Sequence, residues 1–234
     1  MSAIVDRLIW AIKHGEPIPP FQENLDIADA YEIQKKVSER IYSSKLVGLK
    51  AGVTSEEMQH ALKIRSPLIG GLFQENRLDK SPKLPFRGGR LIECELGIFS
   101  DIHGNVQAIC PAIEFAVLDF EKKTDLRGPN LVASNVAVEK FLLGKKSIDI
   151  DSLSKERCSL FRGNTQVNGA NIGNSLGGPR EAAKFIASEA LRRGYELREG
   201  CVFLSGACGD VIKAEPGEYR AEFGGLGELR FEIV

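Results

Sequence analysis

The segment Arg90–Phe99 places two carboxylates, Glu93 and Glu95, two residues apart in an apolar run. In an extended strand such residues point to the same face, so the two side chains would project side by side. Two like charges this close repel, and a strand built for burial must then supply a proton, a cationic neighbour or a divalent metal. Carboxylate oxygens suit Mg²⁺ or Mn²⁺. The alternative is a solvent-facing strand edge with two salt bridges, for which Arg90 is the obvious partner.

A third carboxylate, Glu114, lies in Cys110–Leu118, one of the most apolar runs of the chain. Burying an unpaired charge there would cost on the order of several kcal/mol, so something must compensate it. A third ligand to the same metal would do so, because a Mg²⁺ site takes a few carboxylates and leaves positions for water and substrate. A buried pair with an arginine or a lysine explains Glu114 equally well.

Lys50 lies in a run of small residues between Gly48 and Gly52, where a ligand could approach the backbone closely. Its ammonium could polarise or protonate a substrate oxygen. Taken by itself, the pattern favours an ordinary surface lysine. The next four residues, Thr54–Glu57, are typical of a capping box that opens a short helix with Thr54 at its start.

Composition excludes several classes of function. The 234 residues carry 31 Lys+Arg and 32 Asp+Glu, a net charge of −1 that lacks the basic excess of a nucleic-acid-binding protein. The first apolar stretch, about ten residues interrupted by charges, is neither a secretory signal nor a membrane span, which predicts a cytoplasmic protein without membrane contact. The five cysteines form no CxxC pair and are expected to be reduced packing residues.

The order of the elements predicts one α+β domain over residues 1–234. Residues 1–44 are expected to form a helical part, with one helix ending at Gly15 and a second capped by Asp26. Residues 45–234 are expected to form a large, curved, mostly antiparallel β body, interrupted by a helix from Pro179 to Gly194. The expected strand runs are Leu46–Val53, Leu91–Phe99, Val106–Leu118, Ser159–Val167, Cys201–Ser205 and Tyr219–Val234.

Eight motifs in a fixed order cover nearly the whole chain. They are Asp29–Gln34, Val47–Thr54, Gly70–Phe73, Ile92–Glu95, Pro111–Glu114, Val202–Gly209, Pro216–Gly217 and Gly224–Gly227. In this order they resemble the hydratase/decarboxylase branch of the fumarylacetoacetate hydrolase superfamily, the group of 2-hydroxypenta-2,4-dienoate hydratase and 4-oxalocrotonate decarboxylase.

The resemblance implies a lyase of aromatic meta-cleavage catabolism that acts on a 2-oxo or 2-hydroxy unsaturated carboxylic acid. It also implies the family's β-rich fold and homo-oligomeric assembly. Mg²⁺ or Mn²⁺ would stabilise an enolate of the substrate. The implied metal ligands are Glu93, Glu95 and Glu114, the implied catalytic residue is Lys50, and the expected substrate contacts are Leu72, Ser134, Asn135, Ser205 and Gly206.

Two departures from the family pattern predict a different substrate or a reduced activity. Ser134-Asn135-Val136-Ala137 stands where the family usually has Asp-Asn-Ala-Ser, and only 18 residues separate Glu95 from Glu114, where the family usually inserts a helix. An acylpyruvate or fumarylacetoacetate-type hydrolase on the same fold is one alternative, although His60 lacks the glutamate partner expected at helical spacing. A catalytically silent homologue that binds a keto acid is the other.

Overall fold

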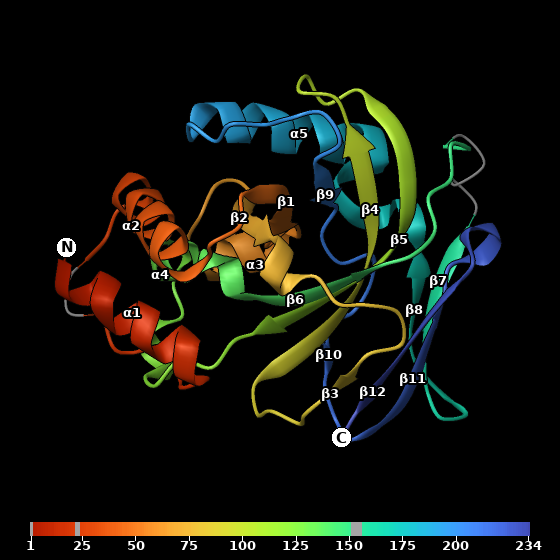
Figure 1. Ribbon diagram of the computed structural model, residues 1–234, viewed down its shortest axis with the longest axis horizontal. Coiled ribbons are helices and arrows are strands. Elements are labelled where there is room, and N and C mark those ends of the chain that lie inside the picture. Colours follow the sequence, from red (N-terminus) through yellow and green to blue (C-terminus); the bar gives the residue numbers. More distant parts are fainter. Residues whose placement is uncertain (1, 22–23, 151–155) are drawn as a thin grey trace.

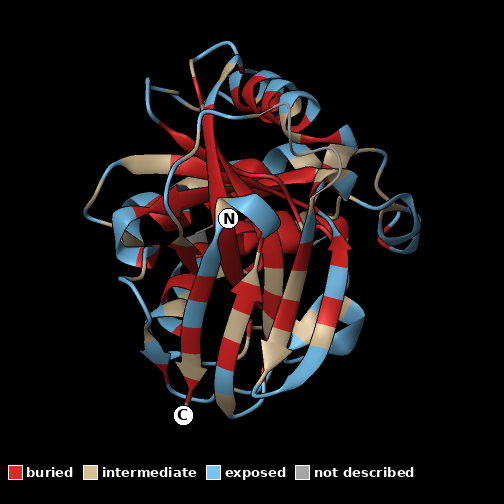
Figure 2. Ribbon diagram, turned by 90° about the vertical axis from the view of Figure 1, so that its right-hand side faces the viewer, coloured by how far each residue is buried: buried red, intermediate tan, exposed pale blue. Residues whose placement is uncertain are grey.

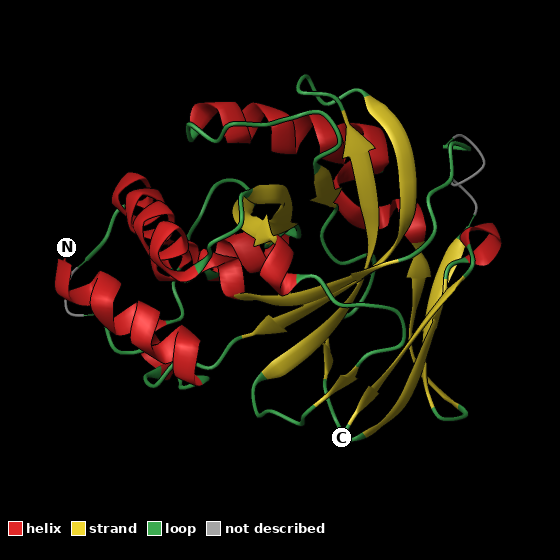
Figure 3. Ribbon diagram, in the orientation of Figure 1, coloured by secondary structure: helices red, strands yellow, loops and turns green. Residues whose placement is uncertain are grey.

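The structure, a computed structural model, describes residues 2–21, 24–150 and 156–234. Its N-terminal part contains two amphipathic helices, α1 (Ser2–His14) and α2 (Ile27–Ile41), which lie together to one side of the sheets (Figures 1 and 3). Gly15, at φ +70°, follows the end of α1, and the carboxylate of Asp26 accepts a hydrogen bond of 2.8 Å from the Asp29 N–H at the start of α2. Both predicted helices are therefore confirmed.

Two sheets form the rest of the fold, and the larger one curls strongly (Figure 1). Eight of the ten strand pairings in the described part of the chain are antiparallel, so the predicted α+β class with a mostly antiparallel β body is confirmed. The larger sheet has the order β2 (Leu68–Phe73), β1 (Leu46–Gly52), β9 (Val202–Leu204), β4 (Arg90–Ser100), β5 (Val106–Val117) and β6 (Val138–Leu143), with β10 (Ile212–Lys213) beside β4. The smaller sheet has the order β3 (Lys83–Leu84), β12 (Glu228–Ile233), β11 (Gly217–Glu222), β7 (Arg157–Arg162) and β8 (Thr165–Asn171).

Three further helices are α3 (Glu56–Ala61), α4 (Gly128–Ala133) and α5 (Pro179–Arg192). Helix α5 begins at its predicted proline and packs across the larger sheet (Figure 1). The cap predicted for α3 is wrong by one residue, because the hydroxyl of Ser55, not Thr54, accepts the hydrogen bond from Met58 N–H. None of the helices in the described ranges has the length and apolar character that crossing a lipid bilayer demands.

Two of the predicted strand runs are wrong as single strands, because each is a hairpin. The run Ser159–Val167 turns at Gly163, which has φ +55° and joins β7 to β8. The run Tyr219–Val234 turns between Gly224 and Gly227, both at positive φ, and joins β11 to β12. In both cases glycine adopts the left-handed backbone conformation that the reversal requires.

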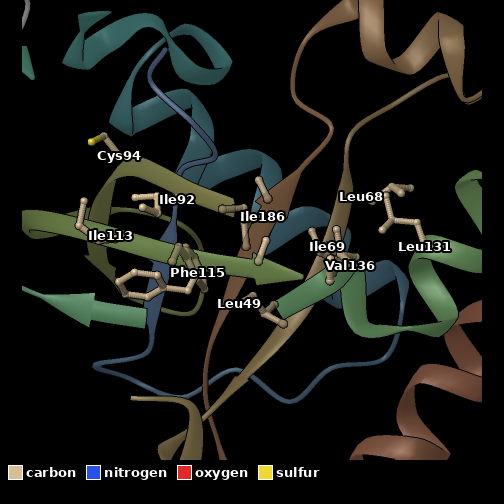
Figure 4. Close-up of a cluster of buried hydrophobic side chains, with 14 of the residues drawn as sticks. Leu49, Leu68, Ile69, Ile92, Cys94, Ile113, Phe115, Leu131, Val136 and Ile186 are labelled. Carbon is tan, nitrogen blue, oxygen red and sulfur yellow. The ribbon is translucent and has the colours of Figure 1, made fainter. Parts of the chain in front are cut away.

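The strands of the larger sheet are buried on both faces. One face, together with α5 and the smaller sheet, encloses the main apolar core, which includes Leu49, Ile92, Phe115 and Ile186 (Figure 4). Figure 2 shows that the smaller sheet, in contrast, alternates between buried and exposed residues along its strands. The other face of the larger sheet carries a second, smaller cluster of Leu72, Ala112, Phe141, Val202 and Leu204.

Phe115 joins the two sheets, since its fully buried ring meets Phe231 of β12 edge to face at a centroid distance of 5.0 Å. We expect Phe115→Ala to lower the free energy of unfolding by about 3–5 kcal/mol, because it leaves a cavity between the sheets. Urea unfolding followed by circular dichroism measures this loss. Phe86→Ala, at a ring that is 52% exposed, is the matched control and should cost far less; equal losses in the two variants would contradict the packing role of Phe115.

Candidate metal centre

Three carboxylates meet on the hairpin of β4 and β5. Glu93 lies directly opposite Glu114 in the antiparallel register, and Glu95 follows two residues along the same face. One oxygen from each carboxylate lies within 4.8 Å of the others. The 18 residues between Glu95 and Glu114 form the outer part of this hairpin, and the pairing of its two strands brings the ligands into register.

Lys50 enters the same cluster from β1. Strand β9 lies between β1 and β4, with Lys50 paired to Leu204 and Leu204 paired to Gly97, so that Lys50 and Glu95 share a face of the sheet. The ammonium nitrogen lies 2.9 Å from Glu114 Oε1, and the lysine side chain is only 3% exposed. The expectation of a surface lysine is therefore wrong, because strand order places Lys50 inside the curled sheet.

The expectation of a solvent-facing strand edge is also wrong. Glu95 and Glu114 are fully buried, and Glu93 is half-buried. Arg90 does not neutralise either carboxylate of its own strand: its guanidinium makes a two-pronged pair with Glu139 of β6, with N–O distances of 2.6 and 2.8 Å. Of the two explanations for Glu114, the buried pair with a lysine is present, and the shared three-carboxylate cluster is present with it.

Burial and mutual repulsion set the protonation of the cluster. Burial, followed by the charge of Glu114, raises the pKa of Glu93 to about 7 against the opposing effect of Lys50. The same causes raise the pKa of Glu95. Burial works against the charge on Lys50, but Glu114, Glu93 and Glu95 outweigh it and raise the pKa of the ammonium. Glu93 and Glu95 thus lack enough positive charge around them to ionise at the pH that is usual for a glutamate.

The donor set fits a hard divalent cation. When all four groups are ionised, three carboxylates and one ammonium leave two uncompensated negative charges. In the described part of the chain, Glu95 Oε1 and Glu114 Oε2 are buried and accept no hydrogen bond. Oxygen donors alone, with no nitrogen or sulfur among them, favour Mg²⁺, Mn²⁺ or Ca²⁺ over softer metals. The residues therefore fit the predicted ion class.

Ser205 and Gly206, expected as substrate contacts, follow the end of β9 and form hydrogen bonds to Glu95 and to its neighbour Leu96 on β4. The Gly206 N–H donates to Glu95 Oε2 at 2.8 Å, which orients that carboxylate and leaves Oε1 free. The Ser205 hydroxyl accepts from Leu96 N–H and donates to the Gly206 carbonyl. Its oxygen is therefore already engaged with the backbone beside the site.

Ser134, Asn135 and Leu72 also have defined partners. The Asn135 amide exchanges two hydrogen bonds, of 2.7 and 2.9 Å, with the backbone of Gly71 on β2. The Ser134 hydroxyl donates to the Leu131 carbonyl, as a helix-terminal serine does. Leu72 is buried on the face of the sheet that carries Lys50 and the carboxylates.

Sequence reasoning missed the backbone that covers Lys50. Asn135, Val136 and Ala137 all have positive φ, and they pack against Gly52 and Gly70, where a Cβ would meet Val136 Cγ1 at 2.5 Å and the Asn135 carbonyl at 2.7 Å. The small residues around Lys50 are the signal that could have indicated this close approach. The sequence suggests an approaching ligand at these glycines, whereas in the structure a segment of the chain itself lies against Gly52 and Gly70.

Comparisons with known proteins agree with this geometry. No protein-family model matches the chain. It is 27% identical over 252 aligned positions to a 2-keto-4-pentenoate hydratase of Paraburkholderia xenovorans, covering 97% of this chain and 92% of that protein. It is 28% identical to the TodF product hydratase of Pseudomonas putida, covering 96% and 91% of the two chains. The resemblance to the hydratase/decarboxylase branch is confirmed.

Solved structures show the same fold. The 4-oxalocrotonate decarboxylase of Pseudomonas putida G7, complexed with magnesium and adipate, aligns with a TM-score of 0.90 at 18% identity over 99% of this chain and 96% of its own. Fumarylpyruvate hydrolase from Pseudomonas aeruginosa, in complex with Mn²⁺ and pyruvate, aligns with a TM-score of 0.59 at 14% identity over 80% and 88% of the chains. The fold is thus nearer to the decarboxylase than to this hydrolase.

Glu95→Gln should abolish specific divalent-metal binding while leaving the fold intact, because the amide keeps an oxygen for the Gly206 N–H but lacks the charge. We expect Mn²⁺ affinity, measured by isothermal titration calorimetry, to fall at least about 100-fold. The exposed Glu121→Gln is the matched control and should bind Mn²⁺ like the unmodified protein. Undiminished affinity in Glu95→Gln would contradict the site.

The metal-free protein should lose stability as the pH rises. Folding raises the pKa of Glu93 from 4.5 to about 7, so the folded protein holds this proton more tightly than the unfolded chain does. The stability that this difference contributes is complete below pH 4.5 and is lost as the pH rises through 7. Urea unfolding at pH 5 and pH 8 in a chelator measures the loss, and saturating Mn²⁺ should reduce it. Glu93→Gln should show a smaller difference between the two pH values; an unchanged difference would contradict the assignment.

Proposed function

We propose that this protein is a divalent-metal-dependent lyase that acts on a 2-oxo or 2-hydroxy unsaturated carboxylic acid, of the 2-keto-4-pentenoate hydratase or 4-oxalocrotonate decarboxylase type, in aromatic meta-cleavage catabolism. The observation that carries the proposal is the buried cluster of Glu93, Glu95 and Glu114 with Lys50 at 2.9 Å from one of its oxygens. Similarity to hydratases over nearly the whole chain supports the same conclusion.

Glu93, Glu95 and Glu114 would hold Mg²⁺ or Mn²⁺ through their free oxygens. Such an ion supplies Lewis-acid polarisation of the oxygens of a bound 2-oxo acid. The Gly206 N–H keeps one oxygen of Glu95 occupied, so this ligand presents the other. Because the three ligands come from one rigid hairpin, their spacing does not depend on the arrival of substrate.

Lys50 is the residue that would act on the substrate directly. It is the only ammonium in the described residues that forms an ion pair with a member of the carboxylate cluster, and its raised pKa keeps it charged. An ammonium held in a site from which water is excluded can stabilise negative charge on the substrate's 2-oxygen or donate a proton to its carbon chain. Glu114 fixes the position of the nitrogen through the 2.9 Å contact.

The remaining predicted contacts would act in different ways. Leu72 would offer an apolar surface on the face that carries the cluster. Since the polar side chains of Ser134, Asn135 and Ser205 are engaged, these residues and Gly206 would shape the site through their backbones rather than bind through free hydroxyl or amide groups. Homo-oligomeric assembly remains a prediction from the resemblance, and a cytoplasmic location remains a prediction from the N-terminal sequence.

An ultraviolet assay with 2-hydroxypenta-2,4-dienoate and 4-oxalocrotonate tests the function. We expect metal-dependent loss of the conjugated chromophore with Mg²⁺ or Mn²⁺ and no turnover in a chelator. Lys50→Met should lower kcat at least about 100-fold while Mn²⁺ still binds, because the carboxylates are untouched.

The exposed Lys184→Met is the matched control and should retain full activity. Cleavage of acylpyruvates in place of the dienoates would establish the hydrolase alternative. Absence of turnover on all three substrate classes, with Mn²⁺ bound, would establish a catalytically silent homologue.

A further inference from the structure

A strained turn lies beside the proposed catalytic lysine. Asn135, Val136 and Ala137 follow one another at φ +57°, +52° and +63°, in the left-handed region that side chains with a Cβ avoid. Val136 is β-branched, which makes this conformation especially unfavourable for it. Such a backbone persists only where surrounding contacts hold it, and these contacts are found on both sides of the turn.

The turn is pressed against the strand that carries Lys50. A Cβ built on Gly52 would lie 2.5 Å from Val136 Cγ1 and 3.2 Å from Lys50 Nζ, so Val136 and the ammonium flank the same point of β1. The Asn135 carbonyl approaches Gly70 on β2 in the same way. Lys50 is therefore bounded by Glu114 on one side and by this turn on another.

Both ends of the turn are fastened. At its first residue, the Asn135 side-chain amide is hydrogen-bonded to both backbone groups of Gly71. After it, Glu139 is the extra residue of a β-bulge, because Val138 pairs with Ala116 and Lys140 with Phe115. Its carboxylate takes two hydrogen bonds from Arg90, the first residue of β4, which is only 4% exposed.

The Glu139–Arg90 pair thus connects two parts of the site. Arg90 begins the strand that carries Glu93 and Glu95, whereas Glu139 is the second residue of β6, which directly follows the turn beside Lys50. A β-bulge changes the direction of one side chain relative to the regular alternation of the strand. Here the bulge directs the Glu139 side chain towards the guanidinium of Arg90. No other described carboxylate pairs with Arg90.

We propose that Glu139 is a positioning residue that, through Arg90 and the turn at residues 135–137, fixes the Lys50 ammonium relative to the three carboxylates. The proposal rests on the proposed function only in the role given to Lys50. Without Glu139, the turn is free to relax from its unfavourable backbone conformation, and Lys50 loses the surface that confines it. The carboxylates stay in place, because the β4–β5 hairpin holds them independently.

Three variants test the proposal. We expect Glu139→Gln to lower kcat about tenfold or more, with KM and Mn²⁺ affinity changed less than about twofold, because misplacing an acting group costs rate rather than binding. Glu189→Gln is the matched control: Glu189 on α5 is also largely enclosed, with a side chain 7% exposed against 16% for Glu139, and is paired with Arg192 and Arg193, away from the turn. It should lose comparable stability but keep its kcat.

The double variant Ala137→Gly/Glu139→Gln tests whether relieving the strain in the turn restores the kcat that Glu139→Gln loses. Glycine accepts a positive φ without strain, so the turn should hold its shape without the anchor and restore much of the lost kcat. A purely structural role for Glu139 gives no reason for this rescue. Equal kcat in Glu139→Gln and Glu189→Gln, or a failure of the glycine to restore kcat, would overturn the proposal.

Reductive methylation of lysines, followed by peptide mass spectrometry, separates this proposal from the proposed function. Lys50 should be protected in the unmodified protein and should react about fivefold or more faster in Glu139→Gln, because local opening exposes it. The Glu189→Gln control and the glycine rescue should stay protected. If the unmodified protein turns over none of the substrates, the proposed function fails, but this labelling still decides whether Glu139 positions Lys50; unchanged labelling overturns it.

Discussion

The electrostatic cost of burying three carboxylates with one ammonium constrains the rest of the larger sheet. Without a counter-charge, Glu93 and Glu95 hold their protons to higher pH than usual, and atoms such as Glu114 Oε2 have no partner. Carboxylates that repel one another stay close together only where fixed contacts of the fold hold them in place. The direct register of β4 with β5, the Gly206 N–H and the Lys50 ammonium provide these contacts.

Strand order explains how distant segments reach the cluster. The parallel pairing of β1 with β9, and the antiparallel pairing of β9 with β4, carry Lys50 to the face occupied by Glu95. The close approach of β9 depends on Gly48, whose missing Cβ leaves room for the Val202 backbone. The apolar cluster around Phe141 and Leu204 then fills the same face and keeps water from the charged groups.

Local rules predicted the features that depend on neighbouring residues. The alternation of a strand placed Glu93 and Glu95 on one face, Asp26 capped its helix, and Pro179 began another. The burial of Lys50 could not be predicted in this way, because it follows from non-local strand order, on which periodicity carries no information. Asn135 and Ser205 carry polar groups that suit a substrate, but their backbone partners lie far away in sequence or depend on a turn that sequence does not specify.

The short segment between Glu95 and Glu114 is compatible with an intact site. The pair Glu93–Glu114 forms at the base of the hairpin, and Glu95 lies opposite Ala112, so residues beyond Gly97–Cys110 do not determine where the carboxylates lie. An insertion beyond that pair would lengthen the hairpin without moving its base. Differences in substrate are more simply sought at residues 134–137, since this segment packs beside Lys50 and carries the altered side chains.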